Sequence, residues 1–297
     1  MKNVPYIILP VFVLSACGGG SGEIVNLPTG ESGYASGSID LDTVGESVAA
    51  SPRLQGGDFS SPPTVGISTV NLSFEDTANV DEFIVTFDGV PVTVNWDPVD
   101  SRFEGVSGDI EVWVSPMFLS DNNQLGFVWM NLFDDRGSSA FRQWGPTLVG
   151  FNTDPNAVSG RSDIATFSGT GNISINAVDN TFWTSANGPA NLSVDFGGGT
   201  LSGTIDLTDC GCGFGGAGID PTTITLANGS ISGNTFSMDA TLDLAELNLA
   251  SFSNVVVDGE FFETNATAVG GYFEGTGTSN IGGIATTMIG AFAADQD

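Results

Sequence analysis

The stretch from Ala190 to Leu207, ANLSVDFGGGTLSGTIDL, decides the fold. On both sides of the three glycines, apolar and polar residues alternate one by one. This period of two is that of a β-strand with one buried face. The glycines supply a turn, so the stretch predicts an antiparallel hairpin.

The same alternation recurs along the chain. It predicts strands at residues 83–87, 92–96, 110–114 and 127–132, and again at 223–226, 230–231 and 236–244. Ala227-Asn228-Gly229 and Gly233-Asn234 are the predicted turns of this last part, with Asn-Gly the stronger hairpin signal. No long helix is predicted, and Leu242–Leu249 favours one short turn.

One-sided alternation over consecutive strands favours a closed antiparallel barrel of the up-and-down type, filled by side chains. Closure removes exposed strand edges, and the many glycines allow the strands to bend. A β-sandwich is the structural alternative.

Composition excludes several functions. The 297 residues contain no histidine, so there is no Ser-His-Asp triad, no Cys-His pair and no His-bound metal. A formal net charge of −29 opposes binding to nucleic acid. A hydrophobic content of 40% is enough for a packed core. We interpret the acidity first as adaptation of the surface to a salty medium; the alternative is a surface matched to a basic ligand.

The N-terminus predicts export and lipidation. Residues 1–16 have a basic start, a short apolar run and small residues before Cys17, as in a signal peptide. Leu14-Ser15-Ala16-Cys17 resembles a bacterial lipobox, which implies lipid attachment at Cys17. Gly18 in place of Asp implies sorting to the outer membrane by the same resemblance. The alternative is an ordinary signal peptide followed by an incidental cysteine. Residues 17–63 are rich in Gly, Ser and Pro and predict a flexible tether.

Four blocks in the last 140 residues resemble a known family. They are ATFSGTG at 165–171, ANLSVDFGGGTLSG at 190–203, GSISGNTF at 229–236, and GEFF at 259–262 continuing through AVGGYF at 268–273 to IGAFAA at 289–294. Their order is similar to that in the C-terminal barrels of transferrin-binding protein B-like surface lipoproteins, relatives of factor H binding protein. The chain has room for one lobe, whereas the two-lobed transferrin receptors have two.

With this resemblance we predict an all-β chain in four parts. Signal peptide 1–16 and tether 17–63 precede a β-rich, handle-like domain at 64–158 and a small eight-stranded up-and-down β-barrel at 159–297. The resemblance implies a non-catalytic lipoprotein, anchored in the outer membrane and displayed on the cell surface. It would bind a protein, an iron carrier or a small solute, with a translocator or a TonB-dependent transporter as a further partner. The alternative is a structural or adhesive envelope lipoprotein without a dedicated solute.

The ligand-binding candidates are Arg136, Phe141, Arg142 and Trp144, because Trp and Arg are enriched in binding hot spots. The alternative is that Phe141 and Trp144 pack between handle and barrel, with the arginines paired to carboxylates.

Other signals are weaker. Cys210 and Cys212 predict a small loop disulfide, with free thiols as the alternative. Asp121–Gly126 lacks the spacing of a calcium loop, so we predict a turn and no metal site. Without histidine we expect no haem and no other cofactor. Carboxylate pairs such as Glu260 with Glu263 leave a glycosidase as the third alternative.

Overall fold

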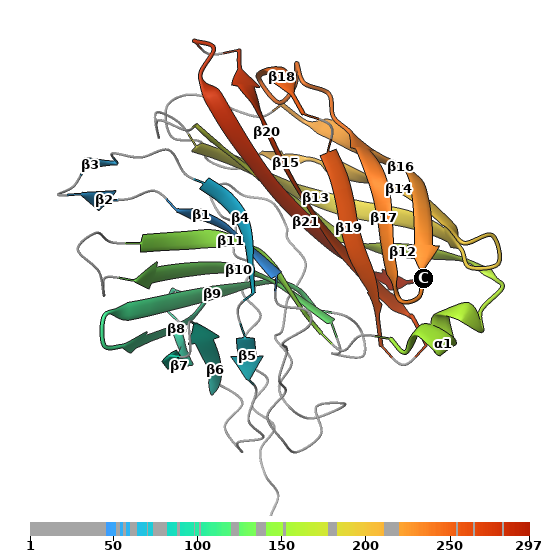
Figure 1. Cartoon of the computed structure of the whole chain (residues 1–297), viewed down its shortest axis with the longest axis horizontal. Helices are drawn as coiled ribbons and strands as arrows, with labels where there is room; N and C mark the ends of the chain where they lie inside the picture. Colours follow the sequence, from blue (N-terminus) through green and yellow to red (C-terminus); the bar gives the residue numbers. More distant parts are fainter. Residues whose placement is uncertain are drawn as a thin grey trace, which may run out of the picture.

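The structure is a computed structural model that describes most of the chain after residue 45. The described residues are 46–51, 54–55, 58–59, 64–69, 71–73, 82–87, 90–97, 99–100, 102–119, 125–134, 141–150, 153–177, 183–210, 220–253, 255–263, 265–280 and 282–297. The predicted lipidation site, Cys17, lies outside them. Two large antiparallel sheets lie side by side, one built from the earlier strands and one from the later strands (Figure 1). The described residues contain no helix that is long and apolar enough to cross a membrane.

The second sheet closes into an eight-stranded up-and-down barrel, which confirms the predicted fold. Each strand pairs with the next along the chain, and the last pairs back with the first, β21 with β12. The strands of the barrel are β12 (Ile164–Ala177), β13 (Trp183–Asp195), β14 (Thr200–Leu207), β16 (Thr222–Ser232), β17 (Thr235–Thr241), β19 (Val255–Phe262), β20 (Ala268–Ser279) and β21 (Ala285–Gln296). The short strands β15 (Asp209–Cys210) and β18 (Leu249–Phe252) add pairings to β13 and β20.

The barrel interior is filled by apolar side chains from alternate positions of its strands. Phe167, Phe261, Phe273 and Phe292 are at most 1% exposed and belong to one core cluster. Gly171 shows how closely the interior is packed. A Cβ at this position would lie 2.5 Å from Cγ2 of Ile205, so the absence of a side chain admits that isoleucine.

The hairpin predicted from residues 190–207 is confirmed. Asp195 pairs with Thr200 across the glycine turn. The prediction at Asn228-Gly229 is wrong in detail, because these residues form a β-bulge inside the single strand β16. Asn228 has φ +55°, which an asparagine tolerates in a bulge as well as in a turn. The chain reverses at the second predicted turn instead, where Ser232 pairs with Thr235.

The first sheet has nine strands in the order β4-β1-β11-β10-β9-β8-β7-β6-β5. They are β1 (Glu46–Ser51), β4 (Thr64–Thr69), β5 (Asn71–Ser73), β6 (Glu82–Phe87), β7 (Val90–Asp97), β8 (Arg102–Ser107), β9 (Ile110–Leu119), β10 (Leu125–Asp134) and β11 (Phe141–Gly150). The four strands expected at 83–87, 92–96, 110–114 and 127–132 are present. One face of the sheet is buried, with Val92, Val94, Ile110, Val112 and Val114 fully enclosed.

Part of the predicted tether is structured. β1 lies between β4 and β11 in the first sheet, and β2 (Leu54–Gln55) and β3 (Asp58–Phe59) form a small hairpin. The sequence of β1, ESVAAS, has small side chains and little hydrophobicity, so it carries a weak strand signal. Its hydrogen-bonded pairing with β4 and β11 stabilises the strand, which the propensity of its own residues does not.

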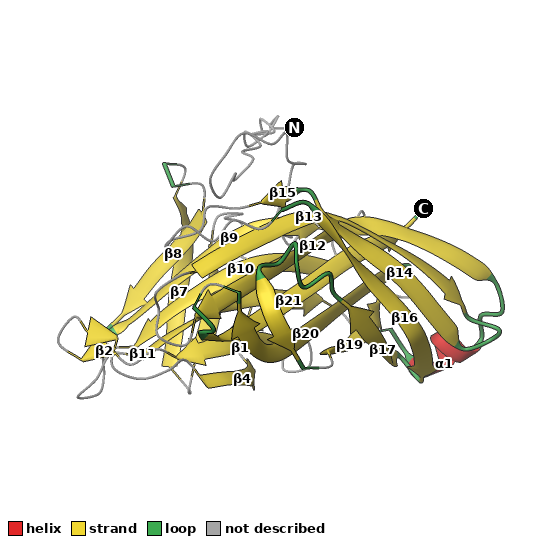
Figure 2. Ribbon diagram, turned by 90° about the horizontal axis from the view of Figure 1, so that it is seen from above, coloured by secondary structure: helices red, strands yellow, loops and turns green. Residues whose placement is uncertain are grey.

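A short helix and a packed contact at Leu148 join the two sheets. Helix α1 (Pro155–Ser159) lies at one end of the barrel, and its Val158 packs into the barrel core (Figure 2). Asp154 caps the helix by accepting a hydrogen bond from the backbone N–H of Asn156 at 2.8 Å. Leu148 of β11 packs against Phe262 and the small side chains of β20 and β21, which allow a close approach.

Candidate functional site

The predicted ligand-binding residues lie on and just before β11. Arg136 lies outside the described residues. Phe141, Arg142 and Trp144 occupy the first half of β11, where the structure describes the backbone but not these side chains. Their role in binding therefore stays a prediction.

The register of the sheet nevertheless assigns these three positions to its two faces. Phe141 pairs with Asp134 of β10, which pairs with Ile110 of β9. Directly paired residues in a sheet share a face, and Ile110 is fully buried. Phe141 therefore occupies a position on the buried face of the sheet.

Trp144 occupies a position on the opposite face. It pairs with Asn131, which pairs with Trp113, which in turn pairs with Glu104 of β8. A parallel row runs from Arg142 through Phe133 and Glu111 to Val106. The first sheet thus brings two of the predicted positions into line with a group of side chains on β8 and β9.

That group is centred on Arg102 and Trp113. The guanidinium carbon of Arg102 lies 4.0 Å from the centroid of the Trp113 ring. Its Nε and Nη2 donate to Oε2 of Glu104 at 3.1 and 3.0 Å, and Nη2 lies 2.9 Å from Oδ2 of Asp100. The indole N–H of Trp113 donates to Oε1 of Glu111 at 2.7 Å. Both large side chains are therefore held in place by carboxylates.

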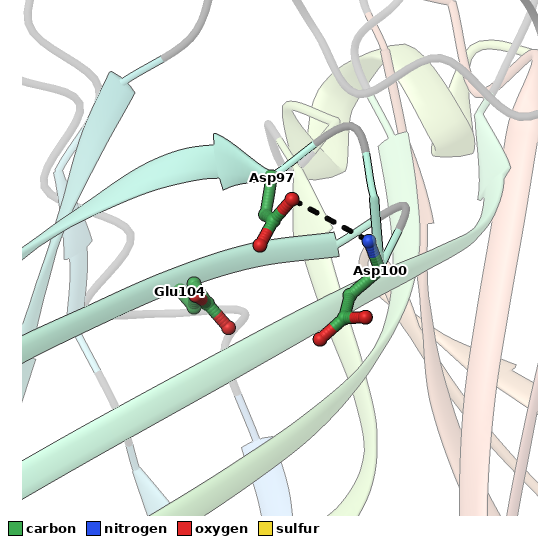
Figure 3. A group of neighbouring side chains, drawn as sticks. All are labelled: Asp97, Asp100 and Glu104. Atoms are coloured by element: carbon green, nitrogen blue, oxygen red, sulfur yellow. Dashed lines mark hydrogen bonds between the residues drawn. The ribbon is translucent and has the colours of Figure 1, made fainter.

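Three carboxylates of this region, those of Asp97, Asp100 and Glu104, point toward a common space (Figure 3). Each offers a ligand atom, and the three atoms lie within 4.8 Å of one another. Oxygen ligands at this spacing are of the kind that bind Ca²⁺ or Mg²⁺. Arg102 forms ion pairs with two of the three, however, and so supplies the positive charge that a cation would bring.

A second arginine, Arg161, lies just after α1 and links two segments at that end of the barrel. Its Nε and Nη2 donate to the two carboxylate oxygens of Asp163 at 3.0 and 2.5 Å. Nη1 donates to the backbone carbonyls of Asn265 and Ala266 at 3.0 and 2.9 Å, and the guanidinium lies 3.8 Å from the centroid of the Phe196 ring. The hydrogen bond from Arg161 lowers the pKa of Asp163. These contacts join the segment just before β12 to the loop between β19 and β20, so the role of Arg161 is structural.

Glu263, one half of a carboxylate pair considered for hydrolysis, is 3% exposed. Its backbone carbonyl accepts a hydrogen bond from Oγ1 of Thr153 at 2.6 Å, and its carboxylate accepts one from Oγ1 of Thr267. These contacts tie the loop after β19 to the segment before α1. Glu263 is therefore a buried residue of this loop, with a structural role.

The cysteine predictions are not tested. Cys210 ends β15, where its backbone pairs with Ala186, but its side chain is not described. Cys212 lies outside the described residues, as does most of the Asp121–Gly126 segment.

Sequence reasoning missed Arg102 and Trp113 as a pair. The signal available was the alternation Arg102-x-Glu104 and Glu111-x-Trp113, which places polar and aromatic residues on one side of each strand. Only the strand at 110–114 was predicted, and β8 was not. Alternation alone does not give the register that sets Glu104 opposite Trp113.

The closed up-and-down barrel is the part of this chain that is similar to a known family. Residues 159–296 match the family model described as the C-lobe and N-lobe beta barrels of transferrin-binding protein B. The C-terminal part of the chain is a transferrin-binding protein B-like β-barrel domain. This agrees with the resemblance in the sequence blocks. No curated protein matches the chain.

This chain is similar to solved structures of transferrin-binding protein B. A double mutant from Haemophilus parasuis Hp5 aligns with a TM-score of 0.50 at 19% identity, over 78% of this chain and 46% of that one. The isotype 1 protein from serogroup B Neisseria meningitidis aligns with a TM-score of 0.41 at 18% identity, over 84% and 44%. This chain spans less than half the length of these two structures.

Proposed function

We propose that this chain is a lipid-anchored surface lipoprotein that binds a protein, an iron carrier or a small solute without catalysing a reaction. The observation that carries the proposal is the barrel match over residues 159–296, together with the open β-sheet that precedes it in the place of a handle. The named relatives are transferrin-binding proteins of about twice this length, so one lobe is the unit to which the proposal applies.

The anchor in this proposal is Cys17. Lipid on its thiol and new amino group would hold the protein in the outer membrane, because several acyl chains give stable attachment where one does not. The residues between Cys17 and the first sheet then set how far the binding domains stand from the membrane. A translocator that carries the protein to the surface, or a TonB-dependent transporter that receives its cargo, is the further partner.

The binding residues in this proposal belong to the first sheet and its loops. Arg142 and Trp144 are favoured by their register positions. Arg142 continues the row of Glu111, and Trp144 continues the row of Trp113. Arg136 lies between β10 and β11 in the sequence, outside the described residues, and stays a candidate. Phe141 is the weaker candidate, because its position lies on the buried face of the sheet.

Protease shaving of intact cells tests the proposal most directly. The protein is expressed in its own bacterium, and intact cells are treated with a protease and blotted for the chain. We expect the protein to disappear while a periplasmic marker survives. A Cys17→Ser variant, which cannot be lipidated, should be released from the membrane fraction. Protection of the wild-type chain until the outer membrane is broken would overturn surface display.

A further inference from the structure

One face of the first sheet combines features of a protein-docking surface. We propose that the outward face of β7, β8 and β9 binds a basic protein surface, an inference that rests on the proposed protein-binding function and names the chemistry of the partner. We call this surface the Arg102 face. It consists of Asp97, Val99, Asp100, Arg102, Glu104, Val106, Glu111 and Trp113.

Two apolar side chains at opposite ends of the Arg102 face are exposed. Val99, in the turn before β8, is 87% exposed, and Val106, near the end of β8, is 69% exposed. The other exposed large hydrophobic side chains among the described residues are Ile164, at 71%, and Val256, at 48%, and both belong to barrel strands. Trp113 lies between the two valines along the sheet, so apolar and aromatic contact area is available along the whole of β8.

The charge of this face selects a cationic partner. Four carboxylates stand against one guanidinium, and the chain as a whole carries a formal net charge of −29. Complementary charge accelerates encounter and excludes partners of like charge. Nucleic acid and anionic lipid are repelled, which leaves a protein surface rich in Lys and Arg as the fitting occupant.

The central side chains are already ordered for binding. Arg102 is held by Glu104, Asp100 and the Trp113 ring, and Trp113 is held by Glu111. They stand on β8 and β9, which pair along their length, so little side-chain freedom is lost when a partner binds. A central Trp–Arg pair with a surrounding polar rim is the composition of an interface hot spot.

The outer barrel wall offers a control in which two carboxylates are neutralised away from the Arg102–Trp113 pair. Asp206 of β14 accepts a hydrogen bond from Thr223 of β16 at 2.7 Å, and Asp258 of β19 is exposed. The described outward positions of β14 around Asp206 are polar and carry no aromatic ring. Neutralising two carboxylates there changes the net charge as much as on the Arg102 face.

The test measures binding of lysozyme, a stable basic protein, to the purified full chain at low salt. We expect Asp100→Asn/Glu104→Gln to weaken binding about tenfold and Asp206→Asn/Asp258→Asn to weaken it less than about twofold. Trp113→Leu changes no charge and should weaken binding about tenfold through lost contact area. Amide hydrogen exchange with lysozyme present should show protection of β7, β8 and β9.

Two outcomes would overturn the inference. Equal losses in the two double variants would mean that binding follows net charge alone, and full affinity in the Arg102-face variants would mean that the partner docks elsewhere. Circular dichroism and urea unfolding identify any variant that fails to fold, and the Asn/Gln variant replaces exposed groups with isosteres. The two proposals fail in different ways. Protection of the chain from protease on intact cells would reject surface display. Digestion of the chain on intact cells, combined with unchanged lysozyme binding in these variants, would reject only the docking role of the Arg102 face.

Discussion

Replacing Arg161 by methionine should destabilise the barrel measurably. Methionine keeps most of the aliphatic stem but removes every hydrogen-bond donor. The Arg161 side chain is only 14% exposed, so water replaces its contacts poorly. The loop between β19 and β20 then loses its link to β12.

The magnitude follows from the separate contacts. A charged hydrogen bond to the partly buried carbonyl of Ala266 contributes about 1.5–3 kcal/mol, and stacking on Phe196 about 0.5–1 kcal/mol. The ion pair with Asp163, which is 50% exposed, adds about 0–1 kcal/mol. We expect Arg161→Met to lower the free energy of unfolding by about 2–5 kcal/mol.

Urea unfolding followed by circular dichroism measures this loss. With a slope of about 2 kcal/mol per molar urea, the midpoint should fall by about 1–2.5 M. The control is Asp163→Asn, which removes the ion pair but leaves the carbonyl and ring contacts, and should cost about 0–1 kcal/mol. A loss below about 1 kcal/mol in Arg161→Met, or equal losses in the two variants, would refute the argument.

Three further predictions concern packing and pH. Leu148→Ala should lower the free energy of unfolding by about 2–5 kcal/mol and increase proteolysis between the sheets, and unchanged proteolysis would show that this contact does not join them. Gly171→Ala should cost about 1–3 kcal/mol in urea unfolding, because its Cβ would lie 2.5 Å from Ile205, and a neutral result would mean that the core yields there. The lowered pKa of Asp163 means that its ionised form is favoured in the folded state, so its contribution is present above its unfolded pKa of about 4 and is lost as pH falls through the lower folded value. Acid unfolding should therefore be less steep in Asp163→Asn over that window, and identical profiles would contradict the assignment.

Much of the strand pattern could be predicted from the sequence, because one-sided alternation is a local property of a half-buried strand. The prediction failed where one short sequence motif is compatible with two local structures. Asn228-Gly229 fits a hairpin turn and a bulge equally well, and the choice depended on whether β14 could pair on both sides of it. The opposite case is β1, which was predicted to be part of the tether because its strand signal is weak. Pairing with β4 and β11 compensates for that weak signal.

The candidate site was predicted in part. Arg142 and Trp144 were selected for residue type alone, and their register positions join them to a larger face. Arg102 and Trp113 were not selected, because the sequence places them eleven positions apart without indicating which strands pair. Strand pairing is a long-range property, and a shift of one residue would move Trp113 to the other face.

By itself the sequence determined the all-β class, the order of the barrel blocks and the absence of histidine chemistry, because alternation, composition and turn residues act locally. Only the tertiary structure decided which residues meet. The Arg161 side chain binds carbonyls 104 and 105 positions away, and Leu148 reaches the barrel across the junction of the two sheets. Such contacts depend on closure of the barrel and on strand register, which arise from the packing of the whole chain.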